Sequence, residues 1–383
     1  MSKEETATIG TLWQTMGGGN GRLGRTSRVF PLPAQLERTL PMRGSVSASP
    51  VFDREENVYL ADMSGEVQAY SAGGGSLWQR DLEEGIYATP ALNPEGKVLY
   101  VGTIRGNVAA LNATDGAVLW RTNIVQKNDP RILADLLYLP QAGWVVTSSW
   151  QEEYAALNAT SGEKQFTWRA GSTPRAAASA TSDETLYYVR TESSGRGRRG
   201  AGIALERMQP AKREESRVFF HAGAAGARDL WASVAPVIDE EHKRVYVITN
   251  IDRTGILHAL SLETGEEAWS QSYERILNAP PAVAQDGSVI VGDLFGSVIG
   301  YDLQGAKKFE YKTGAMFVLS GPVCDQQDRV FVADNEGKIH RVSMDGKGEV
   351  MHEAERSIQG RPAFNPSGKL YVPCTDGKVY VMV

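Results

Sequence analysis

A repeat of about 40 residues runs through most of this chain and constrains its fold more than any other feature. Residues 88–120 and 360–380 match almost residue for residue, with a proline, an Asn-Pro-x-Gly turn and two Val-rich stretches in the same order. The pattern opens at Pro50, Pro90, Leu136, Ala178, Pro236, Pro281, Pro322 and Pro362, with spacings of 40, 46, 42, 58, 45, 41 and 40 residues. That period is typical of a four-stranded propeller blade.

Each unit carries the pattern of four β-strands. A short apolar strand follows the opening residue, a β-branched stretch such as Val98-Leu-Tyr-Val comes next, and a glycine turn precedes a third strand. A second turn ends on a glycine, and a large side chain follows four residues later. These side chains are Trp78, Trp120, Phe166, Trp269 and Phe309. Their fixed place in the repeat indicates packing between blades rather than a set of ligand-stacking rings.

The sequence therefore predicts an all-β fold, a single eight-bladed β-propeller with four antiparallel strands per blade, over residues 1–383 as one domain. The blades are expected to start near residues 45, 85, 131, 173, 231, 276, 317 and 357. The last unit ends at Val383 after three strands, whereas Gly10-Thr-Leu-Trp-Gln matches Gly75-Ser-Leu-Trp-Gln. We expect an N-terminal strand at residues 9–15 to complete the last blade and to close the ring, because closure removes both exposed sheet edges.

The turn sequences carry a family resemblance. Ala110-Leu-Asn-Ala-Thr-Asp-Gly and Ala259-Leu-Ser-Leu-Glu-Thr-Gly, each leading to a tryptophan, resemble the docking motif of pyrroloquinoline-quinone (PQQ)-type repeats, which are WD40-like in architecture. One branch of that superfamily, the quinoprotein alcohol dehydrogenases, holds PQQ and calcium on the ring axis beneath a vicinal cysteine pair, which this chain lacks. The resemblance favours the non-catalytic branch, which is similar to the lipoprotein scaffold of the outer-membrane β-barrel assembly machinery. The lipid-attachment cysteine of that group is absent here.

Charge and motifs exclude several classes of function. A net charge of −6 does not suit a nucleic-acid partner, because phosphate backbones attract basic surfaces. Cys324 and Cys374 lie in no metal or redox motif, the five histidines are scattered, and no nucleophile or phosphate-loop motif occurs. We therefore assign no catalytic, cofactor-binding or metal-binding residue and expect no cofactor. The chain has no signal peptide and no apolar stretch of membrane-spanning length, so it reads as cytoplasmic without direct membrane insertion, or as periplasmic if a leader was removed.

Arginines are the candidate partner-binding residues. An insertion at residues 190–213 is basic, Gly-rich and poor in β-formers, and it contains Arg196, Arg198 and Arg199. Further arginines fall where the chain passes from one blade to the next, so they are expected to line one mouth of the ring: Arg43, Arg131, Arg175, Arg275, Arg356 and Arg361. Guanidinium groups suit carboxylate or phosphate recognition. The alternatives are a mobile hairpin without function and local pairing with Asp129, Glu274 and Glu355.

These observations predict a non-enzymatic scaffold for protein–protein docking, as one subunit of a larger assembly with unidentified protein partners. The alternative is a small-molecule or quinone-cofactor-binding enzyme that uses the axial funnel.

Overall fold

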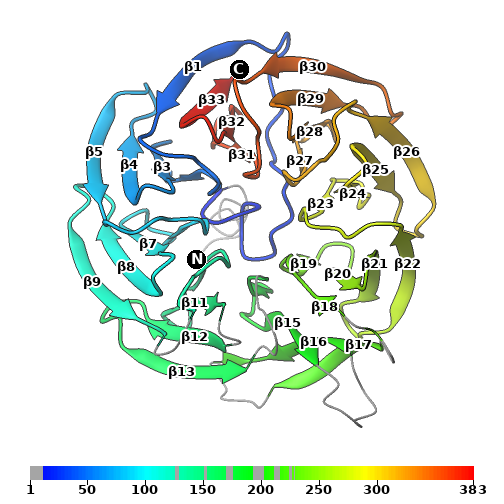
Figure 1. Cartoon of the computed structure of the whole chain (residues 1–383), viewed down its shortest axis with the longest axis horizontal. Helices are drawn as coiled ribbons and strands as arrows, with labels where there is room; N and C mark the ends of the chain where they lie inside the picture. Colours follow the sequence, from blue (N-terminus) through cyan, green and yellow to red (C-terminus); the bar gives the residue numbers. More distant parts are fainter. Residues whose placement is uncertain are drawn as a thin grey trace.

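Eight antiparallel sheets surround a common axis, as Figure 1 shows in a view down the ring. The computed structural model describes residues 12–125, 129–150, 153–169, 176–192, 202–210, 216–223, 227 and 229–383. Among these residues there is no helix with the length and hydropathy that a membrane crossing requires. The predicted eight-bladed propeller is confirmed.

The blades follow one another in chain order, and each innermost strand begins one residue after a position at which the repeat opens. With strands given from the axis outward, blade 1 is β2 (Val51–Phe52), β3 (Val58–Ala61), β4 (Glu66–Tyr70), β5 (Ser76–Asp81), and blade 2 is β6 (Ala91–Leu92), β7 (Val98–Gly102), β8 (Asn107–Asn112), β9 (Val118–Asn123). Blade 3 is β10 (Leu137–Leu139), β11 (Trp144–Ser149), β12 (Glu153–Asn158), β13 (Lys164–Arg169), and blade 4 is β14 (Ser179–Ala180), β15 (Leu186–Glu192), β16 (Gly202–Met208), β17 (Arg217–Gly223).

The second half of the ring repeats this arrangement with one addition. Blade 5 is β19 (Val237–Asp239), β20 (Arg244–Ile251), β21 (Thr254–Ser261), β22 (Glu267–Tyr273), with the extra strand β18 (Leu230–Trp231) beside β20. Blade 6 is β23 (Ala282–Val283), β24 (Val289–Gly292), β25 (Ser297–Tyr301), β26 (Lys307–Lys312), and blade 7 is β27 (Val323–Cys324), β28 (Val330–Ala333), β29 (Lys338–Val342), β30 (Gly348–Glu353). Blade 8 is β31 (Ala363–Phe364), β32 (Leu370–Pro373), β33 (Lys378–Met382), β1 (Leu36–Pro41).

The repeated tryptophans join neighbouring blades. The indole of Trp78 lies against Gly116 in the next blade, where a Cβ atom would sit 2.5 Å from the ring. Its Nε1 donates a hydrogen bond to Ala113 O in the same turn, at 2.7 Å. Trp120 and Trp269 make the same bond to the blades that follow them, at 3.0 and 2.9 Å. Glycine is required opposite each ring because it alone leaves room for the indole and takes a positive φ, +69° at Gly116.

Closure of the ring by an N-terminal strand is confirmed, but the position predicted for that strand was wrong. Residues 36–41 form β1 and pair antiparallel with β33, whereas Trp13 lies near the axis and Leu12 to Thr15 take no part in this pairing. In β1 the place of the tryptophan is taken by Arg38, whose side chain lies against Gly74 of blade 1. The tryptophan signature therefore does not mark the closing strand, and it led the prediction to Trp13 instead.

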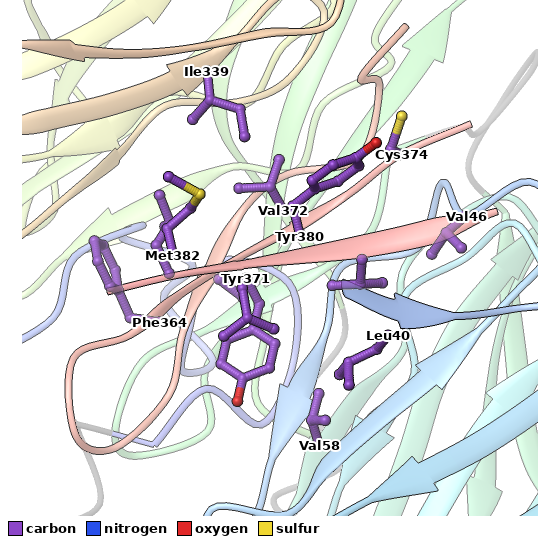
Figure 2. Close-up of a cluster of buried hydrophobic side chains, with 14 of the residues drawn as sticks. Leu40, Val46, Val58, Ile339, Phe364, Tyr371, Val372, Cys374, Tyr380 and Met382 are labelled. Atoms are coloured by element: carbon purple, nitrogen blue, oxygen red, sulfur yellow. The ribbon is translucent and has the colours of Figure 1, made fainter. Parts of the chain in front are cut away.

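The joint between the two ends of the chain is packed as a continuous core. Figure 2 shows its buried side chains, which run from Ile339 in blade 7 through Tyr371 and Val372 in blade 8 to Val58 in blade 1. Leu40 from β1 belongs to the same cluster and is 2% exposed. Because apolar burial stabilises by roughly 25 cal/mol per Å², the joint is held by packing as well as by the strand ladder.

The chain enters the ring through its centre. The N-terminal segment, drawn in dark blue in Figure 1, crosses the axis before it leaves to form β1. Its backbone carbonyls accept hydrogen bonds from the innermost strands of six blades: Trp13 O from Phe52, Gln14 O from Leu92, Asn20 O from Ala180, Gly21 O from Ile238, Leu23 O from Val283 and Gly24 O from Cys324. Side chains reach a seventh, blade 3, where Thr15 Oγ1 and Asn20 Nδ2 donate to Leu136 O and Tyr138 O. We call residues 12–24 the axial segment.

The proposed insertion at residues 190–213 is, in its described part, a regular element of blade 4. Residues 202–208 form the third strand, β16, which pairs with β15 on one side and β17 on the other and is almost wholly buried. The prediction of a β-poor arm was therefore wrong for these residues, because two partner strands outweigh a weak local strand propensity. Residues 193–201 and 211–215 lie outside the described residues.

Candidate functional site

One face of the ring carries the irregular parts of the chain. Because neighbouring strands in a blade are antiparallel, the link between blades and the turn between second and third strands lie at the same end. We call this end of the propeller the connection face. Of the predicted arginines, Arg43, Arg131, Arg275 and Arg356 lie in links between blades and belong to this face by position.

A repeated hydrogen bond ties these two parts together. In each of six blades, a backbone N–H of the turn donates to a carbonyl of the link that leads into that blade: Met63 to Ser45 (3.0 Å), Ile104 to Gly85 (2.9 Å), Trp150 to Arg131 (2.8 Å), Asp252 to Asp229 (2.8 Å), Asn335 to Phe317 (3.2 Å) and Thr375 to Ser357 (3.1 Å). In blade 6 the corresponding residues are Leu294 in the turn and Ile276 in the link. Both are described, and they make no such bond.

A pocket of about 720 Å³ opens at this interruption. It is lined by Asp229, Leu230, Trp231, Asp252, Arg253, Glu274, Arg275, Ile276 and Leu294. Four of these side chains are apolar, and the charged ones comprise three carboxylates and two guanidinium groups. An apolar surface with a few charged groups is the usual composition of a recognition pocket.

Blade 5 builds the raised wall of this pocket. Its strands β20 and β21 contain eight residues each, against four to seven for the second and third strands of the other blades. The extension of β20 gives β18 a partner, with Leu230 opposite Ile251 and Trp231 opposite Asn250. Asp229 N also donates to Asp252 Oδ1 at 3.1 Å, so the tip of the hairpin is fixed to the start of β18.

Arg275 is the predicted arginine that lies in the pocket. Its guanidinium carbon sits 4.4 Å from the ring centre of Phe295, and Nη1 donates to Leu294 O at 3.5 Å. Phe295 itself is 44% exposed, and Met316 in the next link between blades is 64% exposed. A cation stacked on an aromatic ring keeps a defined orientation, so Arg275 presents its remaining N–H groups at the rim.

The other predicted arginines are not gathered at this pocket. Arg131 is held by Asp129, with Nε–Oδ1 and Nη2–Oδ2 distances of 2.9 and 2.7 Å, and it stacks on Trp150. The same hydrogen bonds hold the pKa of Asp129 below its usual value. Arg356 is exposed on the connection face and makes no ion pair within the described residues. Arg175, Arg196, Arg198 and Arg199 lie outside the described residues.

Two further arginines were expected at this mouth of the ring, and only one of them lies there. Arg43 lies on the connection face, paired with Asp81 at 2.6 Å. Arg361 was wrongly placed there by the sequence analysis, because it is 4% exposed and points into the ring. Its guanidinium donates to Pro281 O and Pro322 O, both at 2.9 Å, and to Arg22 O at 3.3 Å. Burial lowers its pKa to about 9.

Arg22 of the axial segment is also buried inside the ring. Its side chain is fully buried and donates to Ala178 O at 3.0 Å and to four more oxygens at 3.3–3.4 Å. Burial lowers the pKa of this guanidinium as well. The axial segment and these two side chains occupy the position that the alternative hypothesis reserved for a bound cofactor. The described axis therefore does not fit a quinone cofactor.

A cluster of possible metal ligands has a simpler explanation. Asp239, Glu241 and His242 lie close enough to hold one ion. Arg25 of the N-terminal region pairs with both carboxylates of the cluster, at 2.6 Å from Glu241 and 3.9 Å from Asp239. His242 Nδ1 lies 2.7 Å from Asp239 Oδ2. The arrangement fixes the N-terminal region to blade 5.

Sequence reasoning missed most of the pocket. Leu230, Trp231 and Ile276 are ordinary apolar residues in sequence, and only the irregular spacing before blade 5 could have pointed to them. The axial segment carried a clearer signal, the run Gly17-Gly-Gly-Asn-Gly-Arg-Leu-Gly. A Cβ atom at Gly21 would sit 2.6 Å from Ile238 O, so glycine is needed where the backbone approaches a blade this closely.

Comparisons with known proteins agree with this fold. The family model described as "Outer membrane protein assembly factor BamB" matches residues 63–252 and 253–383. A protein of that name from Yersinia pestis is 23% identical over 338 residues, which are 85% of this chain and 81% of the relative. The crystal structure of BamB from Moraxella catarrhalis has a TM-score of 0.69 at 19% identity and covers 91% of this chain and 97% of its own. A quinohemoprotein alcohol dehydrogenase from Comamonas testosteroni has a TM-score of 0.76 at 14% identity, covering 100% and 82%. At these identities the two structures show the fold alone.

Proposed function

Since the chain belongs to the family of outer membrane protein assembly factor BamB, we propose that it is a non-enzymatic scaffold that docks protein partners during outer membrane protein assembly. In this proposal it acts as one subunit of a larger assembly. A propeller suits such a role, because its rigid ring presents loops on one face.

The observation that carries the proposal is the pocket between blades 5 and 6. It lies where the repeated bond between turn and link is interrupted, and Trp231, Leu230 and Ile276 give it an apolar lining. Arg275 stands at its edge on exposed Phe295. Aromatic and arginine side chains are enriched among the residues that dominate protein interfaces. We therefore propose this pocket as the main docking point.

The filled axis supports a scaffold over the alternative of a cofactor-dependent enzyme. In a dehydrogenase built on this ring the axis would have to admit a quinone, whereas here Arg22 and Arg361 occupy it with the axial segment. The likeness to an alcohol dehydrogenase concerns the fold, and one fold hosts many functions.

We also propose the periplasm as the place of action, because partners that assemble outer membrane proteins meet their substrates there. This places the protein in the alternative location that the sequence analysis left open, rather than in the cytoplasm.

Site-specific photocrosslinking in the source cells tests the docking point. A photoreactive amino acid at Phe295 is expected to give one strong adduct with a component of outer membrane protein assembly, identified by mass spectrometry. The same amino acid at Val118, 46% exposed on the outer wall of blade 2, is the matched control. Adducts of equal yield at both positions, or none at Phe295, would contradict the proposal.

A second variant separates the pocket from the rest of the face. Arg275→Ala should lower the adduct yield at position 295, because it removes the rim charge and its ring contact. Arg131→Ala removes an arginine of the same face that is already paired with Asp129, so its effect should be small.

A further inference from the structure

A second pocket, of about 430 Å³, lies between blades 4 and 5 at the end of the ring opposite the connection face. It is lined by Thr181, Asp183, Thr185, Tyr187, Arg207, Met208, Gln209, Arg217 and Glu240. These residues come from turns and strand ends of blade 4 and from the first turn of blade 5. They share nothing with the proposed docking point.

Two arginines stand side by side in this pocket. Tyr187, Arg207 and Arg217 are direct cross-strand neighbours on β15, β16 and β17, so their side chains share one face of the sheet. Like charges in directly opposite positions destabilise a sheet. Neither arginine makes an ion pair within the described residues. In the described part of the chain, the fold therefore places two positive charges on directly paired positions without a carboxylate bound to either.

Arg207 is oriented by an aromatic ring rather than by an ion pair with a carboxylate. Its guanidinium carbon lies 4.6 Å from the ring centre of Phe219. Burial raises the pKa of the Tyr187 hydroxyl, and the guanidinium of Arg207 partly offsets this rise. The Phe219 ring packs in turn against Tyr187, with centroids 5.4 Å apart. Stacking fixes the plane of the guanidinium, and a fixed plane lowers the entropy lost when a ligand binds.

The two carboxylates of the pocket are engaged elsewhere. Asp183 accepts hydrogen bonds from Gln209 Nε2 at 2.8 Å, from Thr185 N at 3.1 Å and from the hydroxyl of Thr181. Glu240 accepts from Ser182 N and Oγ, at 2.9 and 2.8 Å. Partial burial opposes the ionisation of Asp183, yet its hydrogen bonds bring its pKa below the usual value. Both acids thus hold the turn between β14 and β15 and leave the arginines available.

We propose that this pocket is a binding site for a small doubly charged oxyanion, of the phosphate class, held between Arg207 and Arg217. Each planar guanidinium can donate two parallel N–H bonds, so two of them match the separate oxygens of a tetrahedral dianion. A bound dianion would also remove the repulsion between the two arginines. A monocarboxylate carries a single negative charge, so it would leave one of the two positive charges without compensation.

Titration of the whole protein with inorganic phosphate, by calorimetry at constant ionic strength with chloride as the balancing anion, tests the site. We expect saturable one-to-one binding that acetate does not reproduce. Arg217→Gln should weaken it by about tenfold or more, the loss expected for a charge-assisted hydrogen bond. Arg207→Lys keeps the charge but not the planar fork, and it should also weaken binding.

Arg105→Gln is the matched control, because Arg105 is also exposed to solvent and lies on the other face of the ring. It changes the net charge by the same amount and should bind phosphate as the wild type does. Glycerol 3-phosphate in place of phosphate shows whether an ester is the better ligand. Circular dichroism first verifies that each variant is folded. Absence of phosphate binding, or equal binding by Arg217→Gln and the wild type, would overturn the proposal.

Discussion

Replacement of Arg22 by methionine should destabilise the protein strongly, although Arg22 lies in a segment without regular secondary structure. The side chain is fully buried on the ring axis, where methionine can replace most of its volume. The guanidinium donates to five oxygens: Ala178 O, Thr15 Oγ1, Met16 O, Asp135 O and Leu136 O. Methionine can donate to none of them.

The size of the effect follows from these bonds. Leu136 O keeps the hydroxyl of Thr15 as a donor at 2.7 Å, and that hydroxyl can reorient. The three remaining carbonyls lose a donor in a buried place, at about 1–2 kcal/mol each. Relief from burying a charge offsets part of this loss, in keeping with the lowered pKa of Arg22. We expect the free energy of unfolding to fall by about 3 kcal/mol.

Equilibrium unfolding in urea, followed by tryptophan fluorescence, measures this change. Arg28→Met is the control in the same region of the chain, because Arg28 is exposed and its Nε donates to one carbonyl, Pro366 O, at 2.9 Å. Loss of this hydrogen bond should lower the free energy of unfolding by well under 1 kcal/mol, as is usual for exposed polar contacts. If Arg22→Met is no less stable than Arg28→Met, the axial segment does not hold the blades together as described.

Three further outcomes are expected. Gly116→Ala should lower the free energy of unfolding by about 3 kcal/mol, whereas Gly143→Ala should lower it by about 1 kcal/mol. Both glycines have a positive φ, but only Gly116 faces the Trp78 ring. Equal losses in urea unfolding would refute the role of that contact. Burial opposes the ionisation of Glu206, yet hydrogen bonds from two hydroxyls and from Arg190 lower its pKa in the folded protein. The ionised carboxylate therefore stabilises the fold fully above the unfolded-state pKa of about 4.3, and this contribution disappears as the pH falls through the lower pKa of the folded state. Glu206→Gln should therefore destabilise the protein more at pH 7 than at pH 3, and a loss independent of pH would count against this. PQQ with calcium should leave the melting temperature unchanged, because the axis is filled; a ligand at 100 times its Kd would add about 2.7 kcal/mol and be visible as a clear shift.

The architecture could be predicted from sequence because the repeat encodes it in every unit. One blade cannot bury its faces alone, so eight similar units imply a ring of stacked sheets. The closing strand was misplaced because its usual marker is missing. Arg38 stands where Trp78 and Trp120 stand in their own blades, and an arginine in this position gives no periodic signal.

The candidate site was harder to predict, because it depends on a local departure from the repeat. Arg275 was identified from its place before blade 6, yet its partners come from β18 and from a hairpin tip more than 20 residues away. The missing hydrogen bond between Leu294 and Ile276 depends on where backbone atoms lie in space. The pattern of residue types in the sequence does not reveal these positions. Arg131 looked equivalent in sequence, but Asp129 two residues earlier pairs with it.

The pairing of β1 with β33 sets the order of events during folding. Leu36 in β1 pairs with Met382 in β33, so all eight innermost strands lie between the two partners in sequence. Until β1 and β33 meet, the arc of blades therefore has two open sheet edges, which are places where chains aggregate. Contacts of such long sequence separation form slowly, because the loop must close before they contribute. The folding chain thus passes through a long vulnerable interval, and a helper that covers open edges would act before the ring closes.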